Sequence, residues 1–147
     1  MPRWISALVS GVVLVSCDVE PIPAPSASVD AGAQDFEVVP DWPRLPAGKV
    51  FGRVLGVAVA PDGRVWVSHT ANGEARNTEP ITGPTLAVLD PATGELLAEH
   101  GAGMFKLPHA LAFDRDGRLW VTDADANELV VLDVTSTPRV VLRIGAD

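Results

Sequence analysis

The chain has 147 residues and a formal net charge of −8, from 19 acidic and 11 basic side chains. This length suffices for one ordinary domain. The basic residues form no cluster, so we do not expect nucleic acid as a partner, because phosphate binding needs a concentrated basic face. A single cysteine excludes an internal disulfide and a Cys-x-x-Cys metal site.

The first 16 residues have the pattern of a signal peptide. A short basic start at 1–4 precedes an apolar run at 5–15, which is too short to span a bilayer. The run ends in Leu-Val-Ser followed by Cys17, which resembles a bacterial lipobox. The resemblance implies that residues 1–16 are removed and that a lipid on Cys17 anchors the protein to a membrane outside the cytoplasm, in the periplasm or at the cell surface. The alternative is an ordinary secretory signal with a chance cysteine.

Residues 17–41 are predicted to be a linker that begins at the lipidated cysteine. Pro21, Pro23, Pro25 and Pro40 alternate with small residues, and no apolar periodicity is sustained. Such a composition favours an extended, polyproline-like spacer. We therefore expect the folded part of the protein to be residues 42–147.

From Trp42 onward the chain repeats itself. Each repeat has an apolar stretch, an Asp-Gly pair and a second apolar stretch, then two more apolar stretches. Asp-Gly favours a tight hairpin, because glycine accepts a positive φ and aspartate tolerates it. Each repeat therefore predicts four short strands, in units at about 42–101 and 102–147. The segments that align are 54–68 with 108–122, 85–90 with 128–133, and 95–101 with 139–145.

The two units differ in the length of one loop. Gly63 and Gly117 are 54 residues apart, whereas Asp90 and Asp133 are only 43 residues apart. The extra residues of the first unit lie at 70–84, a Gly-, Asn- and Pro-rich segment that we predict to be a loop.

A four-stranded unit of this size, with a tryptophan in its second strand, is typical of a β-propeller blade. We therefore predict an all-β fold with two blades of an incomplete propeller, and a small β-sandwich is the alternative. Propellers close with ~4 to 8 blades. Both end faces of a two-blade unit are thus expected to lack a neighbour, which favours self-association or completion by blades from another chain.

Four segments are more specific than the general repeat. They are Trp42–Gly48, Gly52–Val59, Phe105–Leu111 and Leu119–Asp123. Together they resemble the peptidyl-α-hydroxyglycine α-amidating lyases, which are propellers of the NHL type, and the likeness extends over residues 42–147. Generic NHL propellers share the hairpins but usually lack the histidine of the Leu-Pro-His segment. The resemblance implies cleavage of a C–N bond in a peptide substrate that ends in α-hydroxyglycine, which gives a peptide amide and glyoxylate.

The resemblance also implies two metal ions. In the family, three histidines from three blades hold zinc, and backbone carbonyls hold part of a calcium site, as suits imidazole and hard oxygen ligands. By position, His109 matches a zinc ligand, and the carbonyls of Val57 and Leu111 match calcium ligands. Judged without the family, a lone histidine that enters a strand is more often a turn or core residue.

Several of the family's catalytic residues are missing. Thr70 occupies the position of the active-site arginine, and threonine cannot present a cation to a developing oxyanion or a carboxylate. The chain has no tyrosine, which the family also uses. We interpret Arg76 as a solvated loop residue rather than a substitute for that arginine. His69 and His100 do not match the other zinc histidines, and we interpret both as surface or strand-end residues.

We therefore expect a lipid-anchored, lyase-like propeller segment that is inactive as this chain and has no confident catalytic residue. The alternative is a non-catalytic propeller module used for binding or as a scaffold. A calcium-dependent lactonase propeller would require an acidic metal ligand on an opening strand, and none is evident.

Overall fold

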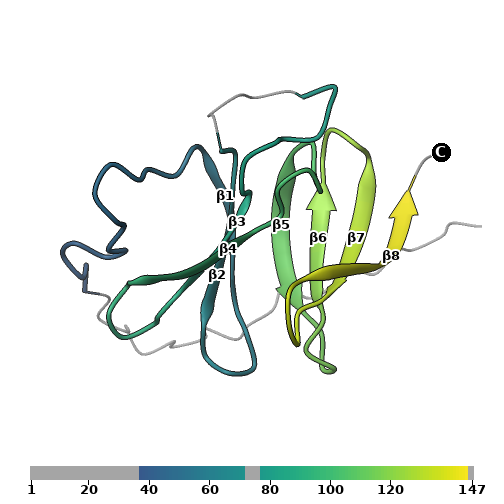
Figure 1. Ribbon diagram of the computed structural model, residues 1–147. Helices are drawn as coiled ribbons and strands as arrows, with labels where there is room; N and C mark the ends of the chain where they lie inside the picture. The colour runs from purple at the N-terminus through teal and green to yellow at the C-terminus, as the bar shows by residue number, and fades with distance from the viewer. Residues whose placement is uncertain (1–36, 72–76, 146–147) are drawn as a thin grey trace, which may run out of the picture. The chain divides into compact units, whose positions relative to one another are not determined.

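A computed structural model of the chain describes residues 37–71 and 77–145 (Figure 1). The chain divides into two units, Met1–Glu37 and Val38–Asp147, and the described strands all lie in the second. The predicted signal peptide, Cys17, most of the predicted linker and Arg76 lie outside the described residues. Within those residues, no helix is long and apolar enough to cross a bilayer.

Eight strands form two four-stranded antiparallel sheets, in the orders β1-β2-β3-β4 and β5-β6-β7-β8. The described residues contain no helix. The predicted all-β fold with two four-stranded blades is thus confirmed, and the sheets do not close into a ring. The strands are β1 (Val54–Val59), β2 (Val65–His69), β3 (Leu86–Leu89), β4 (Leu96–His100), β5 (Pro108–Phe113), β6 (Leu119–Asp123), β7 (Glu128–Asp133) and β8 (Arg139–Gly145).

The first hairpin of each blade turns at its Asp-Gly pair, and only the glycine takes a positive φ. Gly63 has a φ of 88° and Gly117 a φ of 76°. In the first blade the Asp62 carboxylate accepts a hydrogen bond from the Arg64 N–H at 3.0 Å. In the second blade the acceptor is the Asp114 carboxylate, which precedes the Asp-Gly pair and accepts hydrogen bonds from the N–H groups of Asp116 and Arg118. Aspartate therefore acts as an acceptor of turn N–H groups rather than as a second left-handed residue.

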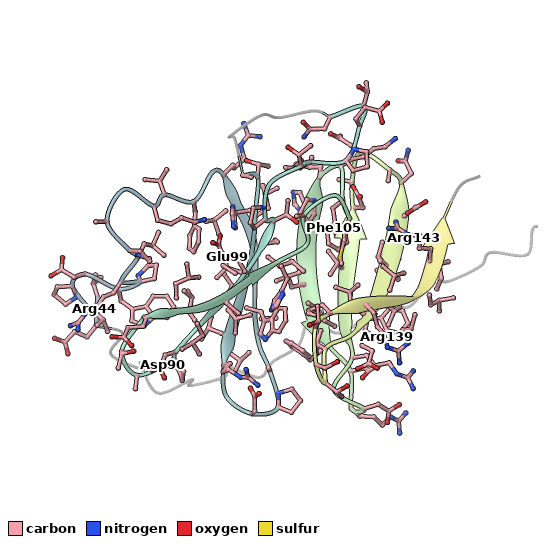
Figure 2. All side chains as sticks on the ribbon, in the orientation of Figure 1. Arg44, Asp90, Glu99, Phe105, Arg139 and Arg143 are labelled. Carbon is pink, nitrogen blue, oxygen red and sulfur yellow. The ribbon has the colours of Figure 1, made fainter. Side chains whose placement is uncertain are left out.

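The core lies between the two blades. We call the side of a blade that faces the next blade along the chain its trailing face, and the opposite side its leading face. The trailing face of blade 1 packs against the leading face of blade 2, and Phe105, labelled in Figure 2, is fully buried there. The buried core residues are Ala60, Trp66, Leu86 and Val88 from blade 1, and Phe105, Leu119, Val121, Val130 and Leu132 from the second blade and its approach segment.

Strands β1 and β5 approach closely at Gly56. A Cβ atom at this position would lie 2.4 Å from the His109 carbonyl oxygen, so only glycine fits. The Ser68 hydroxyl donates a hydrogen bond to the same carbonyl at 2.9 Å. At the other end of the junction, the rings of Trp66 and Phe113 meet edge to face, with centroids 6.0 Å apart.

The leading face of blade 1 is covered by residues 42–51, which we call the cap. Its side chains Trp42, Leu45 and Phe51 pack against a cluster built on Val67, Ala87 and Leu89. The Arg44 N–H donates to the Gly94 carbonyl at 2.8 Å and fixes the start of the cap. The expectation that both end faces lack a neighbour is therefore wrong for blade 1, because the chain covers that face with its own segment.

Candidate functional site

The predicted metal-binding residues lie on the two neighbouring strands at the blade junction. Val57 is on β1, and His109 and Leu111 are on β5. The side chains of Val57 and His109 are exposed, and Leu111 is half-buried. The Leu111 N–H group lies 3.2 Å from where a Cβ of Gly56 would be, so the two strands meet at these positions. The structure therefore brings all three residues to one place in the fold.

The described residues do not by themselves fit a closed zinc site. Residues 37–71 and 77–145 contain no group of three or more His, Cys, Asp or Glu side chains that could hold a metal ion. Catalytic zinc takes three protein ligands, and His109 could supply only one. Calcium takes ~6 to 8 oxygen ligands, and the carbonyls of Val57 and Leu111 could supply only two. These ligand assignments stay predictions.

Thr70 is fully buried and holds the chain between the cap and β1. Its backbone N–H donates to the Arg53 carbonyl at 2.9 Å, and its hydroxyl accepts from the Arg53 N–H at 3.0 Å. A Cβ on Gly52 would lie 1.4 Å from the Thr70 carbonyl oxygen. Thr70, which the sequence predicts to match the family's arginine, is therefore part of a structural contact that is closed to solvent.

His69 ends β2, as a strand-end residue, but it is not at the surface. Its side chain is buried, with 2% exposure, and neither ring nitrogen has a hydrogen-bond partner among the described residues. Burial holds the pKa of His69 below its usual value; the Glu99 carboxylate opposes this shift and the Lys49 ammonium adds to it. Of the interpretation of His69 as a surface or strand-end residue, the strand-end part is confirmed and the surface part is wrong, because the cap lies over the end of β2.

The neighbouring charges join the cap to the outer strand of blade 1. The Lys49 ammonium donates a hydrogen bond to the Glu99 carboxylate at 2.7 Å, and Figure 2 labels Glu99 on β4. His100, the last residue of β4, is half-buried and stacks on Trp66 with centroids 5.8 Å apart. Burial lowers the pKa of His100 as well. Both histidines therefore favour the neutral form in the folded protein.

Asp123 positions the segment that leads to His109. It occupies in blade 2 the repeat position of His69, and its buried carboxylate accepts hydrogen bonds from the N–H groups of Lys106 and Leu107, both at 2.8 Å. Sequence reasoning used Asp123 only as part of the Trp-Val-Thr-Asp resemblance and missed this role. These bonds join residues 16 and 17 positions apart, so no local pattern in the sequence indicates them.

Two blades packed face to face define this chain as an incomplete β-propeller. No protein-family model matches it. The chain is 33% identical over 116 residues to peptidyl-glycine alpha-amidating monooxygenase A of Xenopus laevis, a match that covers 69% of this chain and 12% of that protein. It is 31% identical over 121 residues to peptidylglycine alpha-amidating monooxygenase of Rattus norvegicus, covering 71% of this chain and 12% of the relative.

A third relative carries the name of the lyase itself. The chain is 34% identical over 115 residues to peptidyl-alpha-hydroxyglycine alpha-amidating lyase 2 of Drosophila melanogaster, which covers 69% of this chain and 27% of the relative. These matches span a minor part of each relative's length. They confirm the resemblance: the chain carries a partial, lyase-like domain related to the amidating lyases.

Proposed function

We propose that this protein is an extracytoplasmic, lipid-anchored lipoprotein whose partial lyase-like propeller does not catalyse the lyase reaction by itself. The apolar run that ends at Cys17 supports the anchor. The observation that supports the lack of catalysis is that Thr70, which is predicted to match the family's arginine, is buried and hydrogen-bonded to Arg53. His109 is then the one matched residue that would act through an exposed side chain, since Val57 and Leu111 would act through their carbonyls.

The lyase reaction that the family resemblance implies defines what a site would have to do. The C–N bond of the α-hydroxyglycine breaks and its electron pair goes to the amide nitrogen, which takes a proton. The hydroxyl loses its proton and becomes the carbonyl of glyoxylate, so no oxidant or reductant is needed. A base near the hydroxyl and a positive group near the developing charge are required. His109 offers an imidazole for one of these roles, and Thr70 offers no charge for the other.

A non-catalytic binding or scaffold module is the second candidate. It is favoured by the trailing face of blade 2, where large apolar side chains such as Leu142 and Ile144 stay about half exposed. Apolar patches of this kind mark interaction surfaces in soluble proteins.

Metal analysis of the purified full chain tests the proposal that the propeller segment is inactive. We expect less than one zinc per chain after dialysis, with no difference between the wild-type protein and His109→Ala. Stoichiometric zinc that is lost in His109→Ala would show that His109 works in a shared metal site and would overturn the inactive-segment proposal in favour of the enzyme. Because His109 is exposed, His109→Ala should melt at the wild-type temperature.

A further inference from the structure

The cap is attached to blade 1 mainly through side chains. Its backbone is held at the two ends, where the Arg44 N–H donates to the Gly94 carbonyl and Arg53 shares two hydrogen bonds with Thr70. Among the described residues, no backbone hydrogen bond joins residues 45–52 to the blade. Segments with few such bonds open locally at a lower free energy than the strands of a core. The cap can therefore open while the two blades stay folded.

A polar ring lies under the end of the cap that leads to β1. The imidazole of His69 is 2% exposed, and the ring of Phe51 packs against it. Neither nitrogen of the imidazole has a hydrogen-bond partner in the part of the chain that the structure describes. Burial of an unpartnered charge is costly, so a ring in this position favours its neutral form. Closure of the cap thus selects the neutral imidazole.

Two charged groups act on His69 from the elements packed around it. They are the Lys49 ammonium of the cap and the Glu99 carboxylate of β4, and they shift the pKa of His69 in opposite directions. Val54 of β1 pairs with His69, and the Thr85 carbonyl accepts its N–H; neither residue carries a charge. Burial is the largest influence, and it holds the pKa of His69 below its usual value while the cap is closed.

A proton on His69 would leave one uncompensated positive charge beneath the cap. Among the described residues, Glu99 is the one anion that acts on the ring, and Lys49 already pairs with it. If Glu99 turned to the imidazole, it would give up the ion pair that joins the cap to β4. Either response weakens the attachment of the cap. Opening instead places the imidazolium in water and leaves the strand pairing of the blade intact.

We propose that the cap is a pH-dependent flap, which opens from blade 1 when His69 is protonated while both blades stay folded. A ligand shifts a conformational equilibrium only through its different affinities for the two states. Here the ligand is the proton, which binds the open state more tightly. The flap is therefore closed above the usual histidine pKa of ~6.5 and opens increasingly below it. The proposal depends neither on lyase activity nor on a lipid at Cys17.

The test is hydrogen exchange of the full chain at pH 7.5 and pH 5, in a detergent that also dissolves a lipidated form. Exchange rates are corrected for their intrinsic pH dependence. The amides of Arg53 and Thr70 report on the cap, because both donate hydrogen bonds that hold it to the end of β2. Their protection is expected to fall by up to ~30-fold at pH 5, the limit for a proton that binds only the open state with a pKa of ~6.5.

Two comparisons separate opening of the flap from unfolding of the blades. At both pH values the cap amides should exchange faster than the amides of β6 and β7, and dilute urea should not accelerate them, because local opening exposes little surface. His69→Phe should have the same cap protection at both pH values. His100→Phe is the matched control and should keep the wild-type response, because His100 stacks on Trp66 at the opposite side of blade 1.

Three results would overturn the proposal. The first is cap protection in the wild-type protein that does not change between the two pH values. The second is cap exchange with the same rate and urea dependence as that of β6 and β7, because the cap would then open only on global unfolding. The third is a wild-type pH response in His69→Phe. If His69→Phe does not melt cooperatively, His69→Leu tests the same position with another side chain that cannot take a proton.

Discussion

The ring of Phe51 lies over the ring of His69, with centroids 4.7 Å apart and planes inclined by 31°. The contact joins the end of the cap to the end of β2. It buries an imidazole whose two nitrogens have no hydrogen-bond partner among the described residues. A buried polar ring without partners is stable only in its neutral form, so the attachment of the cap should depend on pH.

Protonation of His69 is expected to destabilise the fold. Its pKa is lowered in the folded state, chiefly by burial, so the unfolded chain binds a proton first as the pH falls. The free energy of unfolding should be steady above the usual histidine pKa of ~6.5 and should decrease below it. Urea unfolding at pH 7.5 and pH 5 measures the difference.

His69→Phe should lose that part of the pH dependence. His100→Phe serves as the control for the other histidine with a lowered pKa. The aspartates of the surface turns do not interfere, because Asp62, Asp90, Asp114 and Asp133 have lowered pKa values and titrate in more acidic solution. An unchanged pH dependence in His69→Phe would contradict the prediction.

Gly52→Ala should be among the most destabilising single-methyl changes in the chain. The new Cβ would meet the Thr70 carbonyl oxygen at 1.4 Å, so the backbone at the end of the cap must move. Overpacking of this kind costs ~1 to 3 kcal/mol and occasionally more. We expect at least the upper end of that range in chemical denaturation.

Gly63→Ala is the control for backbone conformation, because it adds the same methyl group in open space at a φ of 88°. A left-handed alanine costs ~1 to 2 kcal/mol. If Gly63→Ala proved more destabilising than Gly52→Ala, the close contact between Gly52 and the Thr70 carbonyl would be contradicted.

The full chain is expected to release no glyoxylate from a peptide that ends in α-hydroxyglycine, even with zinc and calcium added. Thr70 is buried where a cation is needed, and loss of one preorganised charge-stabilising group costs ~10² to 10³ in rate. Thr70→Arg is not a simple rescue, since the larger side chain cannot fit the buried position. Turnover that disappears in His109→Ala would refute this prediction.

Cys17→Ser should move the protein from the membrane to the soluble extracytoplasmic fraction. Two acyl chains give stable anchoring, because each buried CH₂ contributes ~0.8 kcal/mol, and serine cannot form the thioether. Cell fractionation and the intact mass of the wild-type protein measure the two halves of the claim. Membrane retention of the variant together with an intact residue 1–16 segment would show that Cys17 is not the anchor.

The strands could be predicted because each blade signals them locally. Alternating apolar residues and the Asp-Gly pairs recur in both units, so the alignment of 54–68 with 108–122 placed four of the eight strands. The cap could not be predicted in this way. Its contacts join residues about 50 positions apart, such as Lys49 with Glu99, and its residues have no periodic pattern.

The candidate site shows the same division between local and long-range information. The Leu-Pro-His segment placed His109 correctly on the opening strand of blade 2. Burial of His69 and Thr70 depends on Phe51, Gly52 and Arg53 from the approach to β1, so the residues around the end of β2 do not by themselves indicate it. That Thr70 replaces an arginine stays a prediction of the resemblance, whereas the packing shows its contact with Arg53.

The cap determines at which end of this pair of blades a further blade can pack. In repeat proteins, a terminal unit that hides its apolar side acts as a stop, and extension proceeds from the other end. A further copy of residues 102–145 fused after β8 would meet the half-exposed side chains of Leu142 and Ile144. The same copy fused ahead of Trp42 would meet a surface already filled by Trp42, Leu45 and Phe51. Designed elongation of this protein should therefore succeed from one terminus and fail from the other.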